Sequence, residues 1–292
     1  MAVFKGVCVA MTTPFTETGV DFEAFGRAIE YYLDGGVNAL CVCGTTGEPS
    51  TMSADERNSV IKFAIDKIGG RVPVIVGCGC NSTSSTVANA VDAEKMGADA
   101  LLVVTPYYNK CTQRGLIEHY TAVANATTLP VIMYNVPGRT GVNILPETAV
   151  KLSTVDNIVA IKEACGNMTQ IQKLARLVGD GLDIYLGDDG LTFLGLTLGA
   201  KGVISVVANI APKQTCDITT AFFNGNVSAS REAQFKLNPL IDELFCEVNP
   251  IPVKKGMSLL GFGSAKPRLP LTEMEEDNAT RLEAEMSKLG LL

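Results

Sequence analysis

Val131-Ile132-Met133-Tyr134-Asn135 and Ile158-Val159-Ala160-Ile161-Lys162 are two short, β-rich and almost entirely apolar segments with helix-like sequence between them. Parallel strands that are covered on both faces have this composition, because neither face meets water. Similar segments recur at spacings of roughly 20 to 35 residues, the rhythm of β-α-β units. The expected strands are residues 7–13, 39–43, 74–78, 101–105, 131–135, 158–162, 184–187 and 203–207. Eight such units predict an α/β protein with a (β/α)8 TIM barrel.

The sequence between the expected strands has apolar residues at helical spacing, with Ser53 placed before Glu56 as in a capping box. After the eighth expected strand the chain continues with helical patterns and no further strand segment. These later helices are expected at residues 213–224, 228–246, 252–260 and 277–289. Because Asn224-Gly225-Asn226 is a helix-stop signal, we expect the barrel to occupy residues 1–224 and a C-terminal helical extension to occupy residues 225–292.

Charge and hydropathy exclude several classes of protein. The 292 residues carry 24 Lys and Arg against 31 Asp and Glu, a net charge of −7, with no basic block, so a nucleic-acid partner is not expected. The most apolar stretch, residues 194–212, is interrupted by Lys201 and by glycines, so no membrane span or membrane partner is expected. The first residues lack the pattern of a signal peptide, which favours a cytoplasmic protein.

Cysteine and histidine usage limits the available chemistry. The nine cysteines are spread along the chain, which favours free thiols over a disulfide framework. The pairs Cys41/Cys43 and Cys78/Cys80 are compatible with a metal site, but zinc sites need further Cys or His. Residues two apart on a strand share a face, so these small side chains are instead expected to fill the crowded interior. The only histidine, His119, lies in a helical pattern and is expected on the helix surface. A single histidine argues against catalytic triads and multi-histidine metal sites.

Lys162 is the first candidate for catalysis. On its expected strand it shares a face with Ala160 and Ile158, while Glu163 shares the other face with Ile161. If the first face points into the barrel, an amine ends an apolar strand where barrel enzymes place their reactive groups. Burial favours the neutral amine, which is a nucleophile for carbonyl compounds, so the pattern indicates Schiff-base chemistry. The alternative is a lysine paired with an acid at the rim.

Three further features are expected at the same end of the barrel. Tyr134 ends the preceding strand and offers a phenol for proton transfer, or a packed aromatic ring. Gly44-Thr45-Thr46-Gly47-Glu48 follows the second strand and either approaches an anion with its backbone N–H groups or forms an ordinary turn. Arg139, just beyond Tyr134, either binds a substrate carboxylate or lies on the surface. Their convergence at one barrel mouth favours the catalytic alternatives.

An ordered set of motifs resembles the dihydrodipicolinate synthase family, also called 4-hydroxy-tetrahydrodipicolinate synthases. The set extends over essentially the whole chain, and its order and spacing are very specific. The motifs are Gly44-Thr45-Thr46-Gly47-Glu48, Thr105-Pro106-Tyr107-Tyr108-Asn109, Tyr134-Asn135-Val136-Pro137-Gly138-Arg139-Thr140-Gly141, Ile161-Lys162-Glu163 and Asn249-Pro250-Ile251-Pro252-Val253-Lys254.

The resemblance implies a lyase that condenses pyruvate with L-aspartate 4-semialdehyde in diaminopimelate and lysine biosynthesis. It implies no metal or organic cofactor, and a homotetramer or a dimer. The resemblance also assigns roles to individual residues: Lys162 as the Schiff-base lysine, Tyr134, Thr45 and Tyr108 as a proton relay with Tyr108 from a neighbouring subunit, Thr46 for the pyruvate carboxylate, Arg139 for the aldehyde's carboxylate, and Gly187 and Ile204 as pocket-lining backbone.

Two alternatives remain at this stage. Sibling Schiff-base pyruvate aldolases, such as N-acetylneuraminate lyase or keto-deoxy-sugar-acid aldolases, share the barrel and the lysine, but Arg139 and Thr46 argue against them. A catalytically inactive binding protein on the same barrel is disfavoured because Lys162, Tyr134, Thr45 and Tyr108 are all present.

Regulated members of the family bind lysine at the dimer interface. Of the residues that this implies, Asn81 and Tyr107 are present. Where regulated enzymes often have histidine, lysine or glutamate, this chain has Ser50, Ala54, Arg57 and Ser85. Weak or absent inhibition by lysine is therefore expected.

Overall fold

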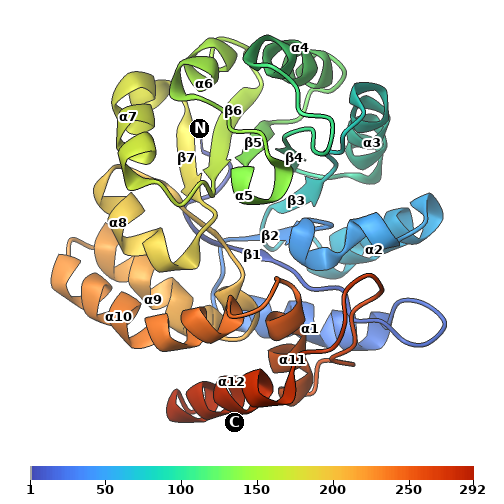
Figure 1. Cartoon of the computed structure of the whole chain (residues 1–292), viewed down its shortest axis with the longest axis vertical. Coiled ribbons are helices and arrows are strands. Elements are labelled where there is room, and N and C mark those ends of the chain that lie inside the picture. Colours follow the sequence, from blue (N-terminus) through green and yellow to red (C-terminus); the bar gives the residue numbers. More distant parts are fainter. Residues whose placement is uncertain (1) are drawn as a thin grey trace.

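Eight parallel strands form a closed barrel in sequence order, with β8 returning to pair with β1, in a computed structural model that describes residues 2–292 (Figure 1). Each expected strand overlaps an observed one, so the barrel prediction is confirmed. The strands are β1 (Gly6–Ala10), β2 (Ala39–Val42), β3 (Val74–Gly77), β4 (Ala100–Val104), β5 (Val131–Asn135), β6 (Ile158–Glu163), β7 (Asp183–Leu186) and β8 (Gly202–Ser205).

Most of the helices surround the strands on the outside of the barrel, whereas the short helix α5 (Pro137–Thr140) lies over the strands in the view of Figure 1. They are α1 (Phe22–Asp34), α2 (Ala54–Ile68), α3 (Thr83–Met96), α4 (Gln113–Ala124), α5 (Pro137–Thr140), α6 (Pro146–Leu152), α7 (Met168–Val178), α8 (Thr192–Thr197), α9 (Pro212–Phe223), α10 (Val227–Leu244), α11 (Ile251–Leu259) and α12 (Glu276–Lys288). Short 3-10 helices are η1 (Thr45–Gly47), η2 (Pro49–Thr51), η3 (Gly179–Gly181), η4 (Asp189–Leu191) and η5 (Val207–Asn209).

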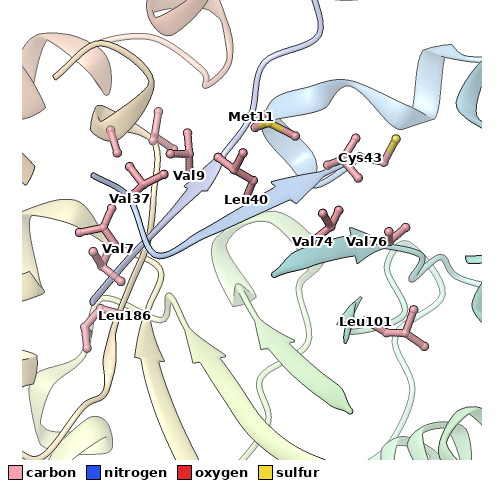
Figure 2. Close-up of a cluster of buried hydrophobic side chains, with 14 of the residues drawn as sticks. Val7, Val9, Met11, Val37, Leu40, Cys43, Val74, Val76, Leu101 and Leu186 are labelled. Atoms are coloured by element: carbon pink, nitrogen blue, oxygen red, sulfur yellow. The ribbon is translucent and has the colours of Figure 1, made fainter. Parts of the chain in front are cut away.

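The apolar residues form two separate layers, because successive side chains of a strand point to opposite faces. The outer layer lies between the strands and the helices and contains residues such as Val7, Val9, Leu40, Val74 and Leu101 (Figure 2). The inner layer fills the barrel itself. Its members from the strands are Cys8, Ala10, Ala39, Cys41, Ile75, Ala100, Leu102, Ile132, Tyr134, Ala160, Tyr185 and Ile204.

The alternation on β6 departs from the sequence expectation at one residue. Ala160 belongs to the inner layer, as expected, but Ile158 belongs to the outer layer. The register between β5 and β6 shifts next to Val131, which pairs with Ile158, while Ile132 pairs with Ala160. This irregularity adds Val159 as an extra residue of β6. Ile158, which precedes it, therefore points to the face opposite to the one that strict alternation gives. The prediction for Ile158 was therefore wrong.

The helical region after the barrel lies beside the first part of the chain. Helix α10 packs against α9 and α12, and α11 packs against α12. All four late helices were expected within a few residues of their observed ends. In Figure 1 the red helices α11 and α12 lie next to α1 at one side of the barrel. Among residues 2–292, no helix is long and apolar enough to cross a membrane.

Three expectations about helices and cysteines need correction. His119 is only 3% exposed, because its side of α4 faces Thr83 at the start of α3, so the expected surface position was wrong. Cys41 and Cys43 do not share a face: Cys41 points into the barrel, whereas Cys43 lies beyond the end of β2, with φ of 55°, and joins the outer layer.

Ser53 does cap α2 by accepting the Glu56 N–H at 3.2 Å, but the Glu56 carboxylate binds Arg268 instead of completing a capping box.

Candidate active site

Lys162 and Tyr134 lie side by side inside the barrel. They are paired residues on the neighbouring strands β6 and β5, and both are inner-face residues near the carboxyl ends of these strands. Lys162 is 5% exposed, and its Nζ lies 4.4 Å from the centre of the Tyr134 ring. Among residues 2–292 no carboxylate lies within salt-bridge distance of Lys162. The alternative of a rim lysine paired with an acid therefore does not apply.

Two buried thiols also lie near the amine of Lys162. Cys8 and Cys41 are both fully buried, and the positive charge of Lys162 opposes the rise in pKa that burial causes in each thiol. Burial raises the pKa of the Cys41 thiol to about 11, even though Lys162 and the Gly44 N–H act in the opposite direction. These cysteines are therefore neutral thiols that fill the barrel interior below the amine.

Gly187, at the end of β7, allows the lysine side chain to reach the cavity. A Cβ atom at this position would lie 2.8 Å from Lys162 Cε, so only glycine fits beside the lysine chain. The Gly187 N–H donates to the Glu163 carbonyl oxygen at 2.8 Å, which fixes this close approach. Gly187 thus lines the cavity, where the sequence analysis expected it.

The threonine loop begins directly after β2. Thr45, Thr46 and Gly47 form η1, with Thr46 2% exposed and Thr45 partly exposed. Gly47 lies so close to the segment after β1 that an added Cβ would be 3.2 Å from the Met11 carbonyl oxygen. Thr13 Oγ1 donates to the Gly47 carbonyl at 2.9 Å. These contacts bring both threonine side chains to the barrel mouth.

Arg139 lies at the opening of the site on the short helix α5. Its Nη2 donates to the backbone oxygen of Asn249 at 3.1 Å, and among residues 2–292 it has no salt bridge to a carboxylate. The guanidinium is exposed and retains further N–H donors. It is therefore available to bind a carboxylate of a ligand.

A cavity of about 190 Å³ brings these groups together. Its lining residues are Ala10, Cys41, Gly44, Thr45, Thr46, Leu102, Tyr134, Val136, Arg139, Lys162, Ala164, Gly187, Asp188, Val206, Phe245 and Asn249. A larger cavity of about 620 Å³ adjoins it and shares Thr45, Tyr134 and Arg139 with it. The smaller cavity contains the amine, so we place the chemistry there and regard the larger one as its outer approach.

Two of the expected site residues lie outside the smaller cavity. Tyr108 is 83% exposed, lines only the larger cavity, and has a left-handed backbone with φ of 72°, which is unusual for a residue with a side chain. Ile204 is fully buried in the inner layer of the barrel, and its neighbour Val206 lines the cavity instead. Six of the eight expected residues therefore meet in one cavity, while Tyr108 and Ile204 do not.

Glu163 is a supporting residue that the sequence analysis did not single out. It is fully buried on the outer face of β6, where its carboxylate accepts from Asn135 Nδ2 at 3.0 and 3.1 Å and from the Cys165 N–H at 2.9 Å. Burial raises the pKa of Glu163, and these hydrogen bonds oppose the rise. Since Asn135 and Glu163 directly follow Tyr134 and Lys162, the bonds hold the two strand ends in register.

Asp188 and Asn249 were also missed as members of the cavity. Asp188 follows Gly187, and its carboxylate accepts the Gly190 N–H at 3.1 Å, while burial raises its pKa. Asn249 comes from the segment before α11, 203 residues beyond Thr46 in the sequence. In the sequence, the only indication of Asn249 was its position at the start of the motif Asn249 to Lys254. In the part of the chain that the structure describes, no group of three or more metal-ligating side chains is present.

A (β/α)8 barrel with its reactive groups at the carboxyl ends of the strands belongs among the barrel enzymes, and a buried amine free of carboxylate partners is available to carbonyl compounds. A sequence model of the "Dihydrodipicolinate synthetase family" matches residues 3–289. The chain belongs to this family of lyases.

Individual relatives agree with the family assignment. The chain is 52% identical over 292 residues to a 4-hydroxy-tetrahydrodipicolinate synthase of Caldicellulosiruptor saccharolyticus, covering 100% of this chain and 99% of the relative. The crystal structure of dihydrodipicolinate synthase from Thermotoga maritima is 45% identical, with a TM-score of 0.98 and full coverage of both chains. A structure described as the first monomeric dihydrodipicolinate synthase variant is 44% identical, with a TM-score of 0.98, covering 99% of this chain and 98% of that one.

Proposed function

We propose that this protein condenses pyruvate with L-aspartate 4-semialdehyde through an imine on Lys162, as a 4-hydroxy-tetrahydrodipicolinate synthase of diaminopimelate and lysine biosynthesis. The observation that carries the proposal is the amine of Lys162, which is buried beside Tyr134 in a small cavity and has no carboxylate partner among residues 2–292. Such an amine is free to attack a carbonyl group.

The first half of the reaction builds a nucleophile from pyruvate. Lys162 Nζ attacks the keto carbon of pyruvate, and loss of water leaves an imine. Its protonated nitrogen withdraws electrons, so that a proton leaves the methyl group and an enamine forms. Thr46, with its hydroxyl at the cavity wall, binds the pyruvate carboxylate. The imine supplies the electron sink, and hence the proposed reaction needs no metal or organic cofactor.

Tyr134, Thr45 and Tyr108 are proposed to carry protons during these steps. Tyr134 is beside the amine, and Thr45 lines the same cavity. A phenol at hydrogen-bonding distance from the carbinolamine donates the proton that leaves with water and then accepts one from the substrate. Tyr108 of a second copy of the chain is proposed to complete the relay, because in its own chain this residue is 83% exposed and does not line the smaller cavity.

The second half of the reaction joins the two substrates. The enamine carbon attacks the aldehyde carbon, a carbon–carbon bond forms, and the aldehyde oxygen takes a proton to become a hydroxyl group. Arg139 binds the carboxylate of the aldehyde at the cavity opening. The amino group of the aldehyde substrate then attacks the imine carbon, which closes the ring and releases the Lys162 amine.

Assembly and location belong to the same proposal. We propose a homo-oligomer, a tetramer or a dimer, because Tyr108 is highly exposed and outside the smaller cavity of its own chain. We also propose that the protein acts in the cytoplasm. Nine free cysteines fit a reducing compartment.

Borohydride trapping followed by turnover assays tests this proposal. Reduction in the presence of pyruvate should leave a stable adduct on the Lys162 peptide, and Lys162→Ala should lose the adduct and nearly all turnover while keeping the wild-type circular dichroism spectrum. Pyruvate is then offered with L-aspartate 4-semialdehyde or with sugar aldehydes such as N-acetylmannosamine. An adduct on another lysine, or preference for a sugar aldehyde, would contradict the proposal.

A further inference from the structure

The larger cavity, of about 620 Å³, has positive charge in its wall and no negative charge. Its lining residues include two arginines and neither Asp nor Glu. Arg139 lines both this cavity and the catalytic one, whereas Arg57 lines only the larger cavity. A cavity of this size accommodates a small organic molecule, and the charge of its wall favours an anion.

The guanidinium group of Arg57 is almost without partners in its own chain. Arg57 is half-buried on α2, and its Nε is buried with no hydrogen-bond partner among residues 2–292. Nη2 donates to Asn58 Oδ1 over a long 3.4 Å. No carboxylate of the described residues lies within salt-bridge distance of Arg57. Most of the N–H donors of this side chain are therefore unused.

The two acids that precede Arg57 in the sequence do not neutralise its charge. Glu56 binds Arg268 through both of its carboxylate oxygens, each at 2.6 Å. Asp55 is exposed in the first turn of α2 and forms no salt bridge within residues 2–292. A partly buried charge without a counter-charge is costly, so a ligand that brings a carboxylate is favoured beside Arg57.

The charge of Arg57 acts inside the cavity. Cys43 and Cys78, both nearly fully buried, line the same cavity. Burial raises the pKa of each thiol to about 12, and the charge of Arg57 opposes this rise. The guanidinium is therefore near the part of the wall that these thiols form. Leu102 and Val104 also line the cavity, so the apolar body of a ligand is accommodated there together with its charge.

We propose that the larger cavity is an effector site for small organic carboxylates, in which Arg57 binds the carboxylate group and the apolar wall contacts the rest of the ligand. Arg57 does not line the catalytic cavity, so this site is separate from the one that holds the substrates. The two cavities share Thr45 and Tyr134, so an occupant lies against the proposed proton relay and slows the condensation. This effect on the rate rests on the proposed function, whereas the binding does not.

Isothermal titration calorimetry with benzoate tests the binding. Benzamide, which has the same ring without the negative charge, is the control ligand. Wild type should bind benzoate about tenfold to a hundredfold more tightly than benzamide. The neutral variants Arg57→Gln and Arg57→Ala should lose this preference, whereas Arg57→Lys, which keeps the charge, should retain most of it. No preference in wild type, or the same preference in the folded neutral variants, would overturn the inference.

A second titration distinguishes the larger cavity from the catalytic one. Wild type is first reduced with borohydride in the presence of pyruvate, so that the adduct on Lys162 fills the catalytic cavity. Benzoate should bind the reduced protein within about threefold of its affinity for the untreated protein. Loss of binding after reduction, or a larger loss of affinity in Arg139→Gln than in Arg57→Gln, would place benzoate in the catalytic cavity and overturn the inference.

Condensation rates test the effect on catalysis. The rate of each variant with benzoate is divided by its own rate without benzoate. Arg57→Gln should need about tenfold more benzoate than wild type for the same inhibition, and Arg57→Lys should resemble wild type. If wild type forms no adduct with pyruvate, the proposed function fails and calorimetry still decides whether Arg57 binds carboxylates. If wild type turns over and binds benzoate without being slowed, the cavity is not an effector site and the inference is overturned.

Discussion

Lys254 Nζ lies 2.6 Å from Glu48 Oε1, and the two side chains are only 1% and 2% exposed. Lys254 also donates to the Thr13 carbonyl at 3.1 Å, and the second carboxylate oxygen of Glu48 accepts the Arg268 N–H at 2.9 Å. Burial lowers the pKa of Lys254, and Glu48 opposes this. Since Glu48 directly follows η1, the pair connects the threonine loop to helix α11 of the C-terminal extension.

Removal of one partner of this pair should destabilise the protein strongly. Glu48→Gln leaves a buried ammonium without its counter-charge and should cost about 3–5 kcal/mol. Lys254→Met should behave similarly, while the double variant should cost clearly less than the sum of the two. Denaturation midpoints measure the effect. The exposed pair of Glu30 and Arg71 is the control, and Glu30→Gln should shift the midpoint little. Equal effects at both pairs would contradict this prediction.

Sequence periodicity predicted the parts of the molecule that depend on local pattern. The strands, the inward direction of Lys162 and the adjacency of Tyr134 follow from alternation along one strand and from barrel topology. The face of Ile158 did not, because the register shift beside Val131 depends on how two strands pair. The contacts of Glu48 with Lys254 and of Thr46 with Asn249 join segments more than 200 residues apart. No local sequence pattern predicts such contacts.

The burial of His119 was missed for a related reason. A helix in a barrel packs against neighbouring helices as well as against the sheet, so helical spacing alone shows only one of its buried sides. His119 Nδ1 lies 2.9 Å from Thr83 Oγ1 on α3, and Nε2 is buried without a partner among residues 2–292.

The buried histidine should make stability depend on pH. Burial lowers the pKa of His119 below its usual 6.5. Between that lowered pKa and 6.5 the unfolded chain binds more protons than the folded one, so the free energy of unfolding rises with pH in this window. The contribution is fully present above 6.5 and is lost as the pH falls. Wild type should therefore lose more stability than His119→Asn between about pH 7.5 and 5.5, measured by urea unfolding. Parallel pH profiles would argue against the prediction.

Tyr108 should act across a subunit interface. It is 83% exposed in the single chain and does not line the smaller cavity that contains Lys162 of its own chain. Tyr108→Phe and Lys162→Ala should each be inactive. When subunits of the two exchange, a hybrid dimer has one site with both groups, and activity should recover to at most about a quarter of wild type. Hybrids are verified by mass spectrometry with a tag on one chain. If verified hybrids stay inactive, Tyr108 acts within its own chain.

Lysine should inhibit this protein weakly or not at all. Arg57 lines the larger cavity together with Ser50 and Tyr107, and its Nε is buried without a hydrogen-bond partner in residues 2–292. Its positive charge repels the ammonium groups of lysine. Ser85, where regulated enzymes have a glutamate, donates its hydroxyl to Ser82 at 3.1 Å. The missing carboxylate removes a charge-assisted hydrogen bond worth about 1.5–3 kcal/mol, or roughly ten- to a hundredfold in affinity.

A titration of L-lysine at saturating pyruvate measures this resistance in the condensation assay. Wild type should keep most of its rate at millimolar lysine, whereas the double variant Arg57→His/Ser85→Glu should become more sensitive by at least about tenfold, because it loses the repulsive charge and gains the carboxylate. Arg57→Lys, which keeps the charge, is the matched control and should remain resistant. Half-inhibition of wild type at submillimolar lysine would mean that Asn81, Tyr107 and the remaining residues suffice to bind the amino acid despite the positive charge of Arg57.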